Sequence, residues 1–127
     1  DPSSGRDFNY MYQLAKSCGV KYKGRIKNLE EELQNYDIVI STSMREGLPR
    51  SILECLANDL YVVGVDAPGV RDVIISPHCG QIVDYSINSV IQGILSYDQN
   101  KVSGASFEVL KNNFNIEIVY EAYFKDL

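Results

Sequence analysis

Two short apolar runs, separated by a helical pattern, constrain the fold of this chain more than any other feature. The runs are residues 37–41 and 61–65, each about the length of one strand, and neither alternates between polar and apolar side chains as a half-exposed strand does. The pattern between them has an apolar helical face formed by Ile52, Leu53, Leu56 and Ala57. A strand, a helix and a second strand in this order predict a parallel sheet in an open α/β domain.

The remaining segments extend this unit in both directions. Helical spacing over residues 8–18 ends at Gly19, and Asn28 with Glu31 has the spacing of a capping box before a helix over 29–36. Pro49 is expected near the first turn of the helix after the first run, where proline is tolerated. The other predicted elements are strands over 20–23 and 81–83, a helix over 70–75, a helix capped by Ser86 with the face Val90, Ile91, Ile94 and Leu95, and helices over 102–111 and 116–124.

The composition limits the classes of function. A chain of 127 residues with 45% hydrophobic and 23% charged residues is one small globular domain with a core of its own. Its net charge of −5 argues against a nucleic-acid-binding protein, which would be basic. Three cysteines without paired spacing favour a reducing, cytosolic setting, with Cys18 and Cys55 as small core residues. The apolar runs are too short to cross a membrane.

Two carboxylates, Glu46 and Glu54, flank a Gly-Leu-Pro turn between the first run and the helix. Backbone N–H groups at a helix N-terminus beside a glycine suit a pyrophosphate, and carboxylates accept hydrogen bonds from sugar hydroxyls. Two glutamates without this context are more often surface residues that favour the helix dipole. Glu54 falls close to the apolar stripe, where an unpaired carboxylate is costly. The arrangement therefore indicates a sugar-nucleotide site, in which a diphosphate lies between two polyols.

Three loops are expected to line one crevice. Ligands of open α/β sheets bind outside the carboxyl ends of the strands. The Glu46 loop, residues 24–26 and residues 66–70 each follow a predicted strand in the same direction. We therefore expect Glu46, Gly47, Leu48, Glu54 and the turn over 68–70 to lie together.

Other candidate residues have weaker support. Arg45 precedes Glu46 and Arg50 lies between the two glutamates, so either could contact phosphate, but we favour their interpretation as exposed arginines on a solvated face, which need no such role. His78 is the single histidine, and one histidine beside Cys79 does not make a metal site. We expect it to be a loop residue and expect no metal. The sequence has no glycine-rich phosphate loop of the G-x-G-x-x-G or G-x-x-x-x-G-K type.

The run EGLPRSILE, from Glu46 to Glu54, resembles the E-x7-E motif of retaining glycosyltransferases with two Rossmann-like domains, the group 1 or family 4 type. The resemblance covers most of the chain. Ser43 stands at the family's usual serine, and residues 68–74 resemble its PG-x-R-E turn, with Asp72 in place of glutamate. Residues 79–83 resemble the later glycine-hydrophobic strand, and residues 114–127 resemble the C-terminal helix of such enzymes.

The resemblance implies a role for each matching residue. Glu46 would be the catalytic residue and would bind hydroxyls of the donor sugar, while Glu54 would accept hydrogen bonds from the ribose. The backbone of Gly47 and Leu48 would face the diphosphate. The other implied substrate-binding residues are Arg25 and Ile26, beside the nucleobase, together with Ser43, Pro68 and Gly69.

The resemblance also implies a partial domain. Residues 1–127 correspond to the donor-binding, C-terminal half of the two-domain (GT-B) architecture, a partial Rossmann-like parallel sheet with flanking helices whose first two strands are missing. In the strand order 3-2-1-4-5-6 these two strands lie between residues 20–23 and 37–41. We expect the 127-residue chain alone to be inactive, because it lacks the acceptor domain and the basic residue opposite the diphosphate.

The form of the motif resembles bacterial surface-polysaccharide enzymes, such as those of lipopolysaccharide biosynthesis. A UDP-sugar is the expected donor, a growing polysaccharide or lipid-linked glycan the expected acceptor, and no cofactor is expected. The parent enzyme is expected in the cytoplasm, with peripheral association at the inner membrane face left open. Three alternatives remain open: a non-catalytic nucleotide-binding or interaction module of the same fold, a nucleotide-sugar epimerase fragment, and a flavodoxin-like domain. The last lacks the expected acidic cluster.

Overall fold

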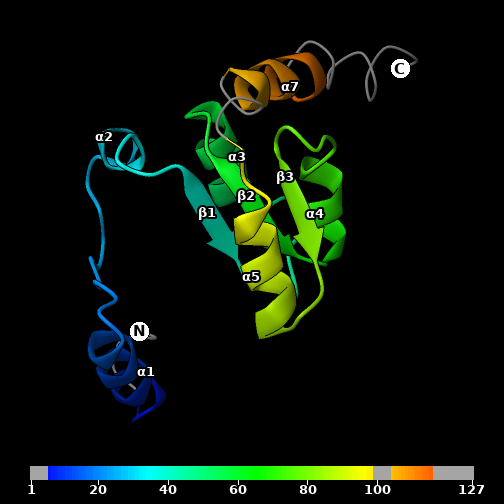
Figure 1. The fold of residues 1–127 in the computed structure, drawn as a ribbon. Helices are drawn as coiled ribbons and strands as arrows, with labels where there is room; N and C mark the ends of the chain where they lie inside the picture. The colour runs from blue at the N-terminus through cyan, green and yellow to red at the C-terminus, as the bar shows by residue number, and fades with distance from the viewer. Residues whose placement is uncertain (1–5, 99–103, 116–127) are drawn as a thin grey trace.

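The computed structural model describes residues 6–98 and 104–115. In this part of the chain a three-stranded parallel sheet of order β1-β2-β3 has helices on both faces (Figure 1). Ile38 lies opposite Tyr61, and Val62 lies opposite Gly80. The predicted α/β class is confirmed, and the open sheet is consistent with a partial Rossmann-like domain. The elements are α1 (Arg6–Ser17), α2 (Leu29–Leu33), β1 (Ile38–Ser41), α3 (Arg50–Ala57), β2 (Tyr61–Val65), α4 (Pro68–Val73), β3 (Gly80–Val83), α5 (Ile87–Leu95) and α7 (Ala105–Asn113).

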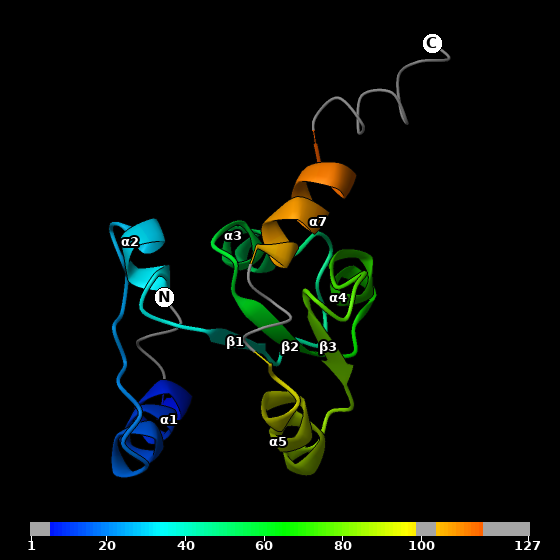
Figure 2. The ribbon, with the colours of Figure 1, turned by 45° about the horizontal axis from the view of Figure 1, so that its top comes forward.

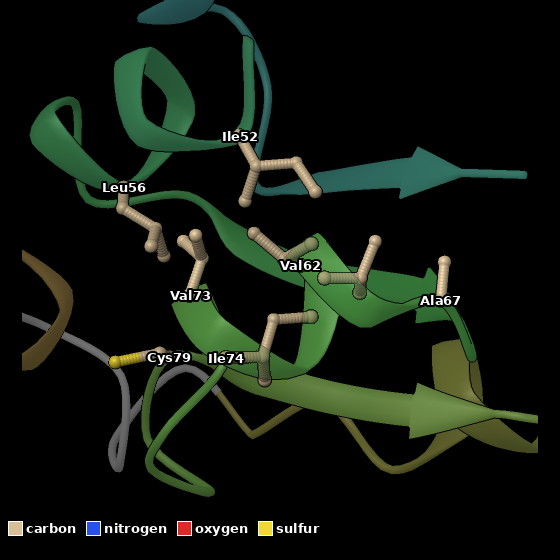
Figure 3. Close-up of a cluster of buried hydrophobic side chains, with 8 residues drawn as sticks. Ile52, Leu56, Val62, Ala67, Val73, Ile74 and Cys79 are labelled. Carbon is tan, nitrogen blue, oxygen red and sulfur yellow. The ribbon is translucent and has the colours of Figure 1, made fainter. Parts of the chain in front are cut away.

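The central strand β2 divides the core into two layers. All five of its residues are buried, and successive side chains point to opposite faces of the sheet. Val62 packs in a cluster with residues of α3 and α4 (Figure 3). Val109 and Leu110 of α7 pack against this cluster. Tyr61, Val63 and Val65 point to the other face, where they pack against α5. Burial on both faces explains why residues 61–65 are apolar throughout.

Helix α5 approaches the sheet closely but covers only part of its face. A Cβ atom added at Gly93 would lie 2.7 Å from Cγ1 of Val63, so the absence of a side chain sets this approach. The predicted cap is present, because Ser86 Oγ accepts a hydrogen bond from the N–H of Ser89. Of the predicted face, Val90 and Ile94 pack against the sheet. Ile91 and Leu95 are exposed, so this half of the prediction is wrong, because no second helix among the described residues covers them.

The segment between α1 and α2 departs from the prediction. Residues 20–23 form no strand, and Val20 and Tyr22 are exposed. A strand needs a hydrogen-bonded neighbour, and residues 20–23 pair with none of the described strands, since β1, at the edge of the described sheet, pairs only with β2. Helix α2 is also shorter than predicted. Asn28 occupies its N-cap position, but its side chain makes no capping hydrogen bond.

Helix α1 was predicted correctly from its spacing but does not enter the core. It ends at Ser17, just before Gly19, whose φ of 77° is favourable for glycine. Cys18 is exposed, so its assignment to the core is wrong, whereas Cys55 and Cys79 are buried. The helical pattern alone cannot distinguish a helix packed on the sheet from one that stands beside it.

Helix α7 receives its N-terminal cap from a distant residue. Gly104, at its N-cap, has no side chain, and the carboxylate of Asp59 accepts hydrogen bonds from the N–H of Gly104 and, at 3.2 Å, from that of Ser106. Asp59 has a φ of 62°, a left-handed conformation that aspartate tolerates better than most residues. The predicted helix over 102–111 is thus confirmed from Ala105 onward, and the helix predicted over 116–124 lies outside the described residues.

Candidate functional site

Two loops meet at the carboxyl ends of β1 and β2. The N–H of Gly69, at the start of α4, donates a hydrogen bond of 3.3 Å to the carbonyl oxygen of Glu46. A Cβ atom added at Gly69 would lie 1.6 Å from the carbonyl oxygen of Gly47 and 2.8 Å from that of Glu46. Glycine is required at this position because any side chain would collide with the backbone of the Glu46 loop. The structure therefore places Glu46, Gly47 and Gly69 together.

The side chains of this loop are accessible to a ligand. Glu46 is half-buried, whereas Gly47 and Leu48 are exposed. Ser43 is half-buried, and its hydroxyl donates a 3.5 Å hydrogen bond to the carbonyl oxygen of Arg45, which helps to shape the loop. Because Pro68 is also exposed, the meeting point of the two loops has an open side.

The N-terminus of α3 lies at the same edge of the sheet. Its N-cap is Pro49, which is buried and supplies no side-chain hydrogen bond to the first turn. Proline therefore stands directly before the first helical turn, near which it was expected. The N–H groups of a first helical turn have no partner inside the helix, and they carry the positive end of the helix dipole. This arrangement suits a negatively charged group beside Glu46 and Gly47.

A bidentate ion pair stabilises the turn after β2. Arg71 donates from Nε to Oδ1 of Asp66 at 2.5 Å and from a terminal nitrogen to Oδ2 at 2.7 Å. These hydrogen bonds lower the pKa of the Asp66 carboxyl below its usual value. Both side chains are accessible to water, so the pair orients the turn more than it stabilises the fold. Asp72, at the position where the resembled family has glutamate, is exposed.

Glu54 lies apart from this meeting point. It is exposed, so the expectation that it lies close to the buried stripe is wrong. Successive residues of a helix are 100° apart, which places Glu54 about 200° from both Ile52 and Leu56, the two most buried side chains of α3. Glu54 instead lines a hollow of about 490 Å³ with Leu29, Glu30, Leu33, Ala57, Asn58 and Phe107.

The hollow around Glu54 contains residues that the sequence did not indicate. Phe107 comes from α7, more than fifty residues after Glu54, and no pattern in the sequence pairs them. The Asn58 amide, which also lines the hollow, donates a 2.9 Å hydrogen bond to the backbone carbonyl of Glu54. None of the residues that line this hollow belongs to the Glu46–Gly69 contact. The structure thus shows two adjacent features of α3, one at its N-terminus and one along its outer face.

The remaining predicted site residues are at the surface. Arg25 and Ile26 lie in the exposed segment between α1 and α2, just after Gly24, whose φ is 62°. Arg45 and Arg50 are exposed beside the Glu46 loop, and His78 lies in the turn before β3, as expected for a loop residue. Within residues 6–98 and 104–115, no group of three or more side chains is arranged to bind a metal ion.

The comparison with known families assigns the chain to one of them. Residues 4–103 match the family described as glycosyl transferases group 1. The chain belongs to this family. The matched region contains both glutamates, the turn with Gly69 and the whole three-stranded sheet. Membership in this group of glycosyltransferases supports a role in glycosyl transfer.

Two further observations complete the comparison. No curated protein matches the chain. Among the described helices of this group 1 glycosyltransferase chain, none is both long and apolar enough to span a bilayer.

Proposed function

We propose that this chain is the donor-binding part of a retaining glycosyltransferase that uses a nucleotide-activated sugar, with a UDP-sugar as the first candidate. The contact between the Glu46 loop and Gly69, beside the uncapped N-terminus of α3, is the observation that supports this proposal most strongly. It combines a carboxylate, open backbone and a helix N-terminus within one short stretch of surface. These are the groups needed to hold a sugar and a diphosphate.

In this proposal the Glu46 loop before α3 and the outer face of α3 bind different parts of the donor. The backbone of Gly47 and Leu48 binds the diphosphate, and Glu46 accepts hydrogen bonds from the donor sugar. Glu54 accepts hydrogen bonds from the ribose, and its side chain lines a hollow that is open to a ligand. The segment of Arg25 and Ile26 lies beside the base. Residues 1–127 are then one partial domain, and the acceptor, a surface polysaccharide or a lipid-linked glycan, binds elsewhere in the parent enzyme.

The donor-binding half would contribute to catalysis mainly by positioning the donor. A leaving diphosphate gathers negative charge, and preorganised N–H groups at a helix terminus stabilise that charge. The chain itself has a net charge of −5, so the attraction must come from local groups rather than from the overall field. Arg45 and Arg50 lie close enough along the chain to add to it.

Titration of UDP into the parent enzyme tests the proposal. We expect Glu54→Gln to weaken binding by about 1.5–3 kcal/mol, the contribution of a charge-assisted hydrogen bond. Glu108→Gln on α7 is the matched control, because Glu108 is an exposed helical glutamate that does not line the hollow. Equal affinity of the Glu54 and Glu108 variants would reduce Glu54 to a helix surface residue.

The same enzyme distinguishes the main alternative. A non-catalytic module of this fold would bind UDP but would transfer no sugar from a radiolabelled donor to any acceptor, even in the parent protein. Transfer that is lost in Glu46→Gln while UDP binding persists would support the assignment of Glu46 to the donor sugar.

A further inference from the structure

Helix α4 is too short to fix its own orientation. It has six residues, and its N-cap residue, Ala67, has no side chain that could cap the first turn. An isolated helix of this length is unstable in water, so contacts outside the helix must hold it. Val70 and Val73 pack into the core on the side of the sheet that α4 shares with α3, opposite α5 (Figure 2). Apolar burial is not directional, so these contacts alone do not set the orientation of the first turn.

The ion pair of Asp66 with Arg71 supplies a directional contact. Asp66 comes directly before the N-cap, and Arg71 lies in the last turn of α4, so the two partners enclose the first turn between them. Two hydrogen bonds, of 2.5 and 2.7 Å, join different nitrogens of the guanidinium to different oxygens of the carboxylate. A bidentate pair fixes an orientation as well as a distance, which a lysine at this position would not do.

The sheet holds Asp66 in place. The N–H of Asp66 donates a 2.9 Å hydrogen bond to the carbonyl oxygen of Val83, the last residue of β3. Asp66 also follows Val65 directly, and Val65 lies opposite Val83 in the parallel register. The backbone that carries the carboxylate is therefore part of the sheet edge, and the ion pair connects α4 to that edge.

The first turn of α4 in turn contacts the Glu46 loop. Gly69 lies between the two partners of the ion pair in the chain, and its N–H donates a 3.3 Å hydrogen bond to the carbonyl oxygen of Glu46. The backbones of the two loops are in direct contact there, because Gly69 has no side chain to separate them. A change in the orientation of the first turn therefore reaches the residue whose carboxylate is proposed to bind the donor sugar.

We propose that the Asp66–Arg71 pair positions Glu46 by orienting the first turn of α4, with Gly69 as the link between them. Asp66 and Arg71 are positioning residues in this inference, and neither contacts the donor. Both side chains are accessible to water, so the pair adds little to the stability of the fold, but it selects one orientation of a short turn. The inference rests on the proposed function for the role of Glu46, whereas the series of contacts stands without it.

Exchange of the Gly69 N–H with solvent tests the series of contacts without an assay of activity. In the ¹⁵N-labelled 127-residue chain, Asp66→Asn and Arg71→Gln should each speed this exchange by about two- to fivefold, the factor that corresponds to an accessible ion pair. Arg71→Lys should restore only part of the protection. Glu32→Gln is the matched control, because it breaks the ion pair of Glu32 with Lys23 on a different part of the chain. An unchanged rate in both test variants would overturn the proposal.

Kinetics of the parent enzyme test what the positioning achieves. Asp66→Asn should lower kcat with the UDP-sugar by about two- to fivefold, because the orientation can shift by no more than the pair contributes. The affinity for UDP should change less, since UDP carries no sugar for Glu46 to orient. The double variant Asp66→Asn/Arg71→Gln should be no slower than either single variant, because the two residues act as one unit.

The remaining outcomes are distinguishable. A loss of UDP affinity in Arg71→Gln but not in Asp66→Asn would make Arg71 a phosphate ligand and overturn the proposal, as would single-variant effects that add in the double variant. A parent enzyme that transfers no sugar would refute the proposed function instead. Exchange of the Gly69 N–H would then still decide whether the ion pair positions the Glu46 loop.

Discussion

Adding one methyl group at Gly69 should separate the two loops of the candidate site. The new Cβ would lie 1.6 Å from the carbonyl oxygen of Gly47, whereas a close carbon–oxygen contact is about 3.3 Å, so the loop must retreat by roughly 1.7 Å. Overpacking of this kind costs about 1–3 kcal/mol. Loss of the Gly69–Glu46 hydrogen bond adds about 0.5–1.5 kcal/mol. Alanine in a helix returns about 0.4–1 kcal/mol by restricting the unfolded chain. We therefore expect Gly69→Ala to lower the free energy of unfolding by about 0.5–4 kcal/mol.

Urea denaturation of the 127-residue chain measures this change, and Gly47→Ala is its matched control. Gly47 lies across the same contact, but a Cβ atom there would have no neighbour within 4 Å, so its replacement should leave stability nearly unchanged. In the parent enzyme, Gly69→Ala should also weaken UDP binding, because the displaced loop contains Glu46. If Gly69→Ala unfolds like the wild type and binds UDP as tightly, the contact between the loops is not a determinant of the site.

Four further outcomes are expected. Asp59→Ala should remove the cap of α7 and lower the free energy of unfolding by about 0.5–2 kcal/mol, measured by urea denaturation. Because Arg71 lowers the pKa of Asp66, the stabilisation from this pair is present above the ordinary carboxyl pKa and disappears as pH falls through the lowered value. Asp66→Asn should therefore reduce the fall of the melting temperature at acidic pH. An unchanged fall would contradict this. Exposed Cys18 should react with a maleimide in the folded chain, whereas Cys79, buried and with its thiol pKa raised by burial, should react only after unfolding, as peptide mapping by mass spectrometry would show. The isolated chain should transfer no sugar from a radiolabelled donor, and turnover by it would refute the two-domain interpretation.

The sheet and its helices were predictable because their apolar patterns are local. Residues 61–65 are apolar throughout because β2 is covered on both faces, and Ser86 caps α5 through a hydrogen bond that spans three residues. The strand predicted over residues 20–23 is absent for the opposite reason, since a strand depends on a neighbour and these residues pair with none of the described strands. A local pattern states what a segment can form, but pairing decides whether it does.

Some positions in the candidate site were predictable from the sequence, and others were not. The proximity of Glu46 and Gly69 followed from the rule that parallel strands end at one edge. The outward position of Glu54 was also available from the sequence, because two residues along a helix from Ile52 is nearly the opposite side. Phe107 was not predictable, since its place beside Glu54 depends on where α7 packs after a long separation in sequence.

The cap that Asp59 supplies to α7 has a consequence for the order of folding. Its carboxylate meets N–H groups 45 and 47 positions later in the chain, so the first turn of α7 cannot be completed until the turn before β2 has formed. On a ribosome the sheet would emerge first and hold this acceptor ready, and α7 would join as a late step. Substitutions at Asp59 should then speed unfolding with little effect on the folding rate, which is the kinetic behaviour of a contact made after the transition state.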